Sequence, residues 1–383
     1  MILKTKDFQD IANKILLAIS VDKSAANLEL KTNGRELYLS VTNKEFYVSI
    51  KLPIEEDEDF HATVDASLFL QLVAGLTSET FKLSINANAV AISSGKSNYK
   101  IAMIYENDKM LELAPITIVN KTLEMPIKHE ILASILNVNS KEIQKVKGLK
   151  NANIREIQEL YYIDESGCFT FTTGACLNSF ELEKPVKLLL NERIVSLFKL
   201  FDGDVDFTLG QDALGNGMVR TKMTLVADNI YLAAIITCDD LLISQVQGPC
   251  AATKRFIKEA YPHKLVLSVT ALRNAIKRLM LFTKNSVDKA NMAFIPMIVR
   301  FDVDELSITD QQGNTEVVDV ENGSYVDESY EMPINVVDLK LVLDSCKEDH
   351  ITMNCGNGHS IVITRGSICN LIPEVHEKEK NAK

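Results

Sequence analysis

The sequence lacks the features that mark membrane, secreted and metal-binding proteins. Its longest apolar runs fall short of the roughly 18–20 residues that cross a bilayer, and its opening residues, MILKTKDFQD, become charged too soon for a signal peptide. Its seven cysteines are odd in number and include no CxxC pair, which predicts reduced thiols instead of a disulfide framework or a zinc site. We therefore expect a cytoplasmic protein that binds no metal or cofactor and has no membrane partner.

Catalytic motifs are missing as well. There is no GxSxG elbow and no HExxH helix, and the six histidines lie in separate places along the chain. Ser94–Ser97 reads SGKS, like the end of a phosphate-binding loop, but Val90 stands where such a loop needs glycine. The residues around it also predict a hairpin instead of a strand, loop and helix. Because no motif assembles an acid, a base and a nucleophile, we predict that the protein is not an enzyme.

Positive charge is scarce overall and concentrated in two segments. The chain has 41 Lys and Arg against 52 Asp and Glu, and a net charge of −11 disfavours nonspecific nucleic-acid binding over the whole surface. Residues 141–155 carry five cations and one acid, and residues 268–284 carry four cations and no acid, so the rest of the chain has −11 − 8 = −19. This segregation suits a protein that accepts polyanions in one place, although two solvated basic faces would give the same count.

What the chain has in abundance is repetition. An amphipathic helical pattern occurs three times, and a second helical pattern follows it each time at a similar distance, with alternating strand patterns around both. Helices on one face of antiparallel sheets define an α+β layer architecture. We predict an α+β fold of three repeated domains, each with two helices packed on antiparallel sheets. The first helices are expected over residues 6–20, 128–141 and 268–284, and the second over 65–77, 191–201 and 335–346.

The repeat also predicts where the domains begin and end. We expect domains at residues 1–118, 119–250 and 251–375, and a charged tail at residues 376–383. Linkers are expected near Ala114–Thr122 and Gly248–Tyr261.

Three short segments resemble the bacterial DNA polymerase III beta subunit, the sliding clamp. Residues 93–103, SSGKSNYKIAM, resemble the hairpin that ends the family's first domain, and residues 171–177, FTTGACL, resemble its T-D-G-x-R-L segment. Residues 370–375, NLIPEV, resemble its C-terminal ending. With the threefold order of elements, the resemblance covers essentially the whole chain and identifies it as a divergent member. It implies the DNA clamp fold, in which each chain is half of a six-domain ring closed by a head-to-tail homodimer.

The resemblance further implies that the ring encircles duplex DNA and tethers the replicative polymerase for processivity. Lys and Arg on the inner helices would contact phosphates without reading bases, which gives salt-dependent, sequence-independent affinity. Arg273, Lys277 and Lys284 fall within about 40° on a helical wheel and form one stripe. The second candidate patch consists of Lys145, Lys147 and Lys150.

The resemblance also implies an apolar pocket between the second and third domains, where extended peptides of polymerases and clamp loaders dock. Leu177 and Ile372 are expected to anchor the partner, because buried apolar contacts at a pocket centre carry most of the binding energy. Ala175, Cys176 and Thr253 replace larger polar or basic residues of the family, which predicts weaker binding of a standard clamp-binding peptide. The positions that match the family's pocket are Thr172, Gly174, Leu177, Pro249, Leu371, Ile372 and Pro373.

Two alternatives to the clamp stay open from the sequence. A clamp-fold interaction protein or decoy would regulate replication without encircling DNA, and an unrelated repeat enzyme would share nothing with the family. A stable monomer in a native mass spectrum would favour the interaction protein. Stimulation of a polymerase on primed circular DNA would favour the clamp.

Overall fold

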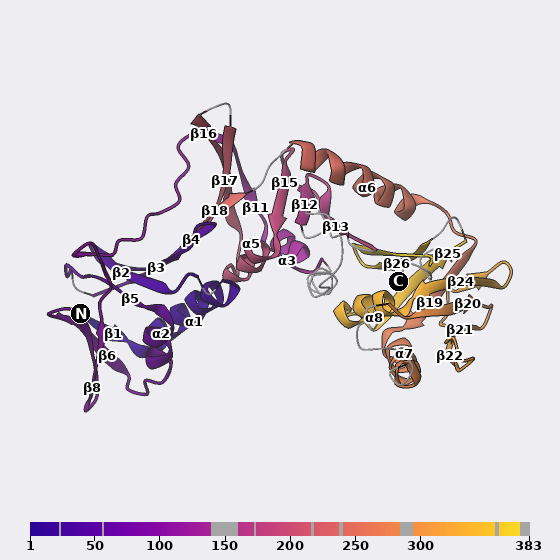
Figure 1. Cartoon of the computed structure of the whole chain (residues 1–383), viewed down its shortest axis with the longest axis horizontal. Coiled ribbons are helices and arrows are strands. Elements are labelled where there is room, and N and C mark those ends of the chain that lie inside the picture. The colour runs from indigo at the N-terminus through magenta and orange to yellow at the C-terminus, as the bar shows by residue number, and fades with distance from the viewer. Residues whose placement is uncertain are drawn as a thin grey trace. The chain divides into compact units, whose positions relative to one another are not determined.

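The chain repeats one order of elements three times: a strand, a helix, four strands, a second helix and three strands (Figure 1). The predicted threefold repeat of two helices with antiparallel strands is thus confirmed. The structure is a computed structural model, and it describes residues 1–22, 24–55, 57–138, 160–171, 174–215, 218–236, 240–283, 294–356 and 360–375. The predicted charged tail, residues 376–383, lies outside the described residues.

The first repeat shows why these sequences fold locally as they do. Phe8 on the first helix is fully buried and meets Phe69 of the second helix and Phe81 edge-on, with ring centroids 6.0 and 5.3 Å apart. Asp65 caps the second helix by accepting a hydrogen bond from Leu68 N at 2.7 Å, as its position predicts. The elements are β1 (Ile2–Lys4), α1 (Thr5–Val21), β2 (Asn27–Asn33), β3 (Glu36–Thr42), β4 (Phe46–Pro53), β5 (His61–Asp65), α2 (Ala66–Ala74), β6 (Thr80–Asn86), β7 (Ala89–Ser94) and β8 (Ser97–Ala102).

The second repeat has the same order, with a short second helix that continues as a 3₁₀ turn. Its elements are β11 (Lys121–Ile127), α3 (His129–Leu136), β12 (Leu160–Asp164), β13 (Gly167–Phe171), β14 (Ala175–Ser179), β15 (Lys187–Asn191), α5 (Glu192–Ser196) with η2 (Leu197–Leu200), β16 (Val205–Gly215), β17 (Met218–Ala227) and β18 (Ile230–Ile236).

The third repeat follows the same plan, and a few elements fall outside the repeated order. The repeated elements are β19 (His263–Ser268), α7 (Val269–Thr283), β20 (Pro296–Phe301), β21 (Glu305–Thr309), β22 (Thr315–Asp319), β24 (Tyr330–Asn335), α8 (Val336–Ser345), β25 (His350–Cys355), β26 (Ser360–Arg365) and β27 (Ile368–Pro373). The additional elements are β9 (Tyr105–Glu106), β10 (Lys109–Met110), β23 (Tyr325–Val326) and α6 (Asp240–Lys258).

Successive repeats are joined by the same kind of strand pairing. The last strand of the second repeat, β18, pairs antiparallel with β4 of the first repeat, and the last strand of the third repeat, β27, pairs with β14 of the second. Two continuous sheets result, in the orders β11-β16-β17-β18-β4-β3-β2-β5 and β15-β12-β13-β14-β27-β26-β25-β19-β23. The closing strand of each later repeat thus adds to a sheet of the repeat before it.

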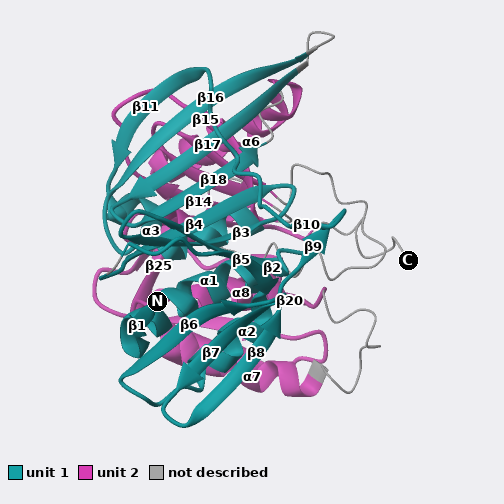
Figure 2. Cartoon of the chain, turned by 90° about the vertical axis from the view of Figure 1, so that its left-hand side faces the viewer, with its two compact units in different colours: residues 1–133, 193–237 teal, residues 134–192, 238–383 magenta. Residues whose placement is uncertain are grey.

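The chain divides into two compact units, and the second repeat contributes residues to both of them (Figure 2). Unit 1 comprises residues 1–133 and 193–237 and contains the sheet that joins the first two repeats. Unit 2 comprises residues 134–192 and 238–383 and contains the sheet that joins the last two. Of the helices in the described ranges, none combines the length and the apolar composition that a membrane crossing requires.

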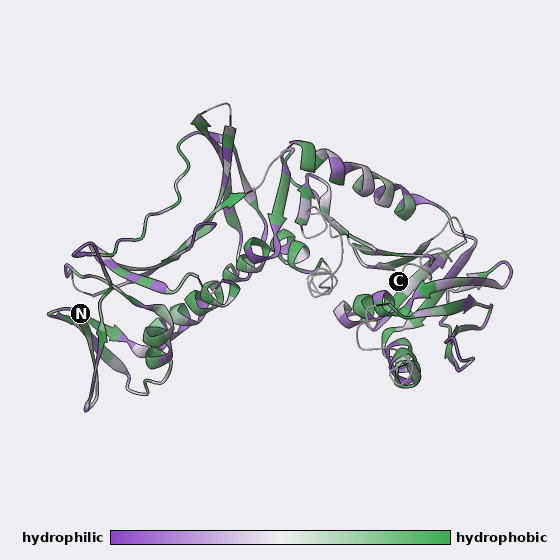
Figure 3. Ribbon diagram, viewed as in Figure 1, coloured by the Kyte–Doolittle hydropathy of each residue, from purple (hydrophilic) through white to green (hydrophobic). Residues whose placement is uncertain are grey.

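The segment predicted as a linker, Gly248–Tyr261, is helical over most of its length and lies between β18 of the second repeat and β19 of the third. Asp240–Lys258 forms α6, a helix of 19 residues, and the domain boundary expected between residues 250 and 251 falls inside it. Apolar and polar residues alternate along this helix (Figure 3). Ile243, Val246 and Cys250 follow the i, i+3, i+7 spacing of one helix face and are buried, which explains why a segment containing Gly248 and Pro249 is helical.

Candidate partner-binding face and basic helix

Helix α6 covers an apolar face of the sheet in unit 2 (Figure 1). The side chains of Tyr162, Phe169, Leu177 and Leu189 form this face with Ala175, and each is at most 9% exposed. Successive residues of a strand point to opposite faces, so alternate positions of β12, β13 and β14 meet the helix. We call this set the covered face: Leu160, Tyr162, Phe169, Phe171, Ala175, Leu177, Leu189 and Leu371, against Leu242, Ile243, Val246, Cys250 and Ile257 of α6.

The residues predicted for a peptide pocket lie in different environments. Leu177 and Leu371 belong to the covered face, Gly174 is buried just before β14, and Pro249 lies on the exposed side of α6. Ile372 is 1% exposed and packs in the core of the third repeat, on the face of β27 opposite Leu371. Pro373 ends β27 opposite Ser360, and Thr172 lies outside the described residues. The structure therefore brings Leu177 and Leu371 together and separates Ile372 from them.

Polar contacts hold the C-terminal half of α6 to the turn between β12 and β13. Lys254 Nζ donates to Asp164 Oδ2 at 2.7 Å and to Ser166 Oγ at 2.6 Å. Burial alone would raise the pKa of Asp164, but the hydrogen bonds from Lys254 and Ser166 lower it below its usual value. Burial raises the pKa of the Cys250 thiol to about 11, so this cysteine is a neutral, apolar contact at pH 7. Gln247 Nε2 donates to Tyr162 Oη at 3.4 Å.

The middle of α6 is intrinsically weak. Pro249 has no N–H to donate to the preceding turn, and an interior proline costs a helix about 3 kcal/mol relative to alanine. Gly248 adds about 1 kcal/mol by the same scale. Thr253 Oγ1 donates to the Pro249 carbonyl at 3.0 Å, which satisfies one acceptor there. The helix is therefore held by its contacts with the covered face more than by its own backbone.

The predicted DNA-binding stripe on α7 is only partly free to meet a ligand. Arg273 donates to Leu343 O at 2.5 Å and to Cys346 O at 3.4 Å, so it satisfies carbonyls at the C-terminal end of α8. Lys277 is exposed and makes no ion pair within the described residues. Arg278, which lies off the stripe, forms a two-point pair with Glu316 of β22. The remaining predicted cations, Lys284, Lys145, Lys147 and Lys150, lie outside the described residues.

Several other helix cations also make intramolecular pairs. Lys14 of α1 pairs with Asp202 at 2.6 Å, and Arg193 of α5 pairs with Asp22 and Glu45 at 2.9 and 3.3 Å. These contacts tie the second helix of the second repeat to the first repeat within unit 1. Cations used in this way are less available to phosphate than the charge pattern of the sequence suggests.

We expect Arg273→Glu and Lys277→Glu to have different effects. Arg273→Glu removes charge-assisted hydrogen bonds and places a negative charge at the negative end of α8, which costs about 1.5–3 kcal/mol, near the low end because the side chain is 39% exposed. Lys277→Glu should change stability by less than about 0.5 kcal/mol. Urea unfolding of both variants measures this, and equal stabilities would show that Arg273 does not brace α8.

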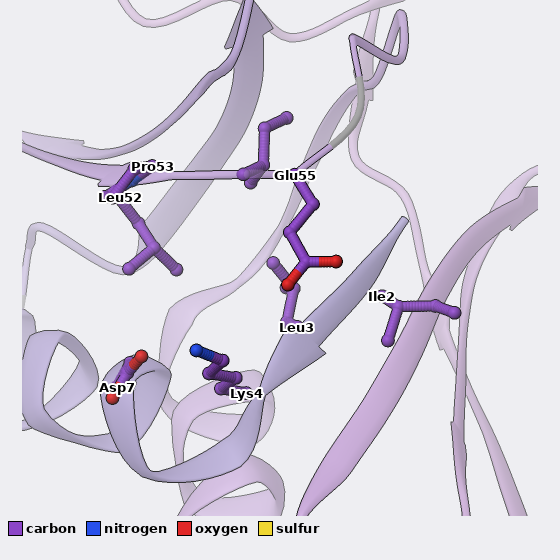
Figure 4. Close-up of a pocket in the computed structure, with 8 residues that line it drawn as sticks. Ile2, Leu3, Lys4, Asp7, Leu52, Pro53 and Glu55 are labelled. Atoms are coloured by element: carbon purple, nitrogen blue, oxygen red, sulfur yellow. The ribbon is translucent and has the colours of Figure 1, made fainter.

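One described cavity lies apart from these residues, in unit 1. It has a volume of 270 Å³ and lies between the start of the chain and the end of β4. The charged side chains of Lys4, Asp7 and Glu55 lie among apolar ones there (Figure 4). This mixed lining of apolar side chains, one cation and two carboxylates favours no particular ligand. The other lining residues are Ile2, Leu3, Leu52, Pro53 and Ile54.

Reasoning from the sequence missed Ile243, Val246 and Lys254 as contributors to this region. Their i, i+3 and i+11 spacing was a usable signal, because it places all three on nearly one side of a helix. Six cysteines of the described chain are unpaired thiols. Within the described ranges, no group of three His, Cys, Asp or Glu side chains is arranged to hold a metal ion.

Comparisons with known proteins agree with this architecture. Residues 5–109 match the profile of the DNA polymerase III beta subunit, N-terminal domain. A search of curated protein sequences finds no match. Among solved structures, the beta subunit of Thermotoga maritima is 15% identical with a TM-score of 0.72 and 98% coverage of both chains. That of Pseudomonas aeruginosa is 13% identical with a TM-score of 0.73, and a Helicobacter pylori beta clamp bound to a DNA ligase peptide is 13% identical with a TM-score of 0.68; each alignment covers 98% of this chain and 99% of the other.

Proposed function

We propose that this chain, which has the clamp fold of the DNA polymerase III beta subunits and carries that family's N-terminal domain at residues 5–109, is a DNA sliding clamp. The family consists of non-catalytic processivity factors, and a non-catalytic role follows for this chain. In the proposal, two chains form a head-to-tail ring around duplex DNA in the cytoplasm and tether the replicative polymerase.

The observation that carries the proposal is the strand pairing between repeats. The closing strands of the second and third repeats each add to a sheet of the repeat before them. The corresponding strands are β8 in the first repeat and β22 in the third, and neither pairs with another described repeat. Both strands end their sheets in the described chain. A second copy would satisfy both edges, because its β22 pairs with β8 and its β8 pairs with β22, and such a heterologous contact closes into a ring.

The internal pairings also support a specific register for this proposed contact. Ile230, the first paired residue of β18 after its turn, lies opposite Ile50, and Ile368 at the same place in β27 lies opposite Asn178. Ile50 and Asn178 each stand three residues beyond Tyr47 and Ala175, the first residues of β4 and β14 that pair with the preceding strand. The corresponding residues of the free edges are Ser97 and Val318. We therefore expect Ser97–Lys100 to run antiparallel to Thr315–Val318 of the second copy.

Duplex binding in this proposal is weak and independent of sequence. Lys277 and, in the segments outside the described residues, Lys284, Lys145, Lys147 and Lys150 would supply phosphate contacts. The involvement of Arg273 in α8 reduces its share. The slope of log affinity against log salt concentration is negative. Lys277→Glu should reduce its magnitude by about one, because one fewer counterion is released. Fluorescence anisotropy with a labelled duplex at several salt concentrations measures the slope, and an unchanged slope would mean that α7 does not face the DNA.

Partner proteins of the clamp would dock on unit 2, around β14, β27 and the middle of α6. The place follows the resemblance of residues 171–177 and 370–375 to the family, and the Helicobacter pylori beta clamp bound to a DNA ligase peptide supports a peptide as the partner. Gly174, Leu177, Leu371 and Pro373 supply the described part of the site, and Thr172 adjoins it in the sequence. Ile372 would support the site from the core beneath, and Pro249 would mark its edge on α6.

The second candidate is a clamp-fold interaction protein that regulates replication without encircling DNA. The intramolecular contacts of Arg273, Arg193 and Lys14 favour it, because cations engaged within the protein are less available to bind DNA phosphates. Polymerase synthesis on primed circular DNA separates the two functions. A clamp should raise processivity on circular DNA and lose that effect on linear DNA, from which a ring slides off. Equal behaviour on both templates would contradict the clamp.

A further inference from the structure

Helix α6 packs on the covered face in the way that a bound helix packs on a binding surface. The face is made of large apolar side chains on rigid strands, and α6 contributes an amphipathic helix with Ile243, Val246 and Cys250 at the i, i+3 and i+7 positions. Recognition of one apolar helix face by a complementary surface is a recurring mode of protein binding. Lys254 adds a charged contact to Asp164 at one end.

The construction of α6 makes it easy to release. Only Ile243, Val246, Cys250 and Thr253 of its residues are buried, and Gly248 and Pro249 interrupt its backbone in the middle. The sheet beneath is by contrast held by continuous ladders from β12 through β27. Local opening therefore favours loss of the helix before loss of the sheet.

We propose that α6 is a replaceable cover, which competes in cis with an amphipathic helix of a partner protein for the covered face. The partner helix carries apolar residues at i, i+3 and i+7 and a lysine at i+11, the positions of Ile243, Val246, Cys250 and Lys254, so that its lysine reaches Asp164. This inference rests on the proposed function only in placing partner docking at β14 and β27. Because α6 is tethered, its effective concentration is on the order of millimolar, so a partner must bind the face more tightly than α6 does.

The test uses the full chain and a labelled synthetic peptide of residues 240–258 as the probe, under reducing conditions. Ile243→Asp with Val246→Asp removes the anchors of α6 and opens the face. Ser244→Asp with Gln245→Asp adds the same charge on the exposed side of the helix and serves as the matched control. We expect the opened variant to bind the peptide at least tenfold more tightly than the wild type and the control. Adding Leu371→Asp to the opened variant should abolish this gain.

A folded opened variant that binds the peptide no better than the wild type would overturn the proposal. If the opened variant does not fold, hydrogen exchange of the wild type tests the proposal instead. Amides of α6 should then exchange at least tenfold faster than those of β14, and Pro249→Ala should slow them; exchange of both elements at one rate overturns the cover. Sedimentation is measured on the same samples to test the proposed ring separately. A monomeric protein would contradict the ring, and the peptide titration would still test whether α6 covers the face.

Discussion

Replacing Asn98 with proline is expected to weaken the proposed dimer. A two-residue turn joins Ser94 and Ser97, which makes them a hydrogen-bonded pair, so the backbone N–H of Asn98 points away from β7 toward the free edge. Proline removes that donor and leaves the β7–β8 ladder intact. Each of the two interfaces loses about 0.5–1.5 kcal/mol, which weakens the dimer roughly tenfold to a hundredfold. Sedimentation velocity at micromolar concentration measures the change.

Asn98→Ala is the matched control, because it keeps the backbone donor, and it should remain dimeric. The register is checked separately with Tyr99→Cys and Glu316→Cys in one chain. Tyr99 of one copy should face Glu316 of the other in a close pair whose Cα atoms are about 4.5 Å apart, within the range of a disulfide. Tyr99→Cys with Val318→Cys, a diagonal pair, should not crosslink. Crosslinking of the diagonal pair alone would show that the register is shifted.

Leu177→Glu is expected to detach α6 from the sheet. The side chain of Leu177 is 2% exposed beneath the helix, and loss of its packing costs about 2–5 kcal/mol before the buried charge is counted. Trypsin cleavage after Lys254 and Arg255 should become at least tenfold faster, because both lie on the released helix. Mass spectrometry of short digests locates the cuts.

Leu241→Glu, at a position of α6 that is 66% exposed, places the same charge outside the contact and should leave the cleavage rate unchanged. Equal rates in the two variants would mean that α6 does not depend on Leu177. Rapid cleavage at many sites in Leu177→Glu would indicate that the whole unit unfolds, and the covered face would then be part of the obligatory core.

Local patterns were enough to predict the repeated elements. The buried faces of α1 and α7 follow the 3.6-residue period. Asn33 and Gly34, a dipeptide typical of hairpins, form the turn between β2 and β3, with Gly34 at a φ of +60°. Asp65, which directly precedes the apolar residues of α2, caps that helix. These features depend on neighbours close in sequence, which is why a single sequence reveals them.

The misjudged features depend on contacts distant in sequence. Gly248 and Pro249 predict a break, but packing of Val246 and Cys250 on the sheet outweighs their low helix propensity. Arg273 reaches the end of α8, a contact that a helical wheel cannot show. Leu371 and Ile372, both predicted for one pocket, face opposite sides of β27, because successive residues of a strand alternate between its faces.

The two sheet edges formed by β8 and β22 have a consequence for the number of chains in a closed assembly. Any chain built from these repeats keeps one edge of each kind, however many repeats it contains. The number of subunits in a closed assembly is then set by the repeats that complete a circuit, divided by the repeats in each chain. In the proposed ring of six repeats, a chain with two repeats would close the ring as a trimer, and a chain with six would close it alone. Changes in gene length could thus alter subunit number without the evolution of a new interface.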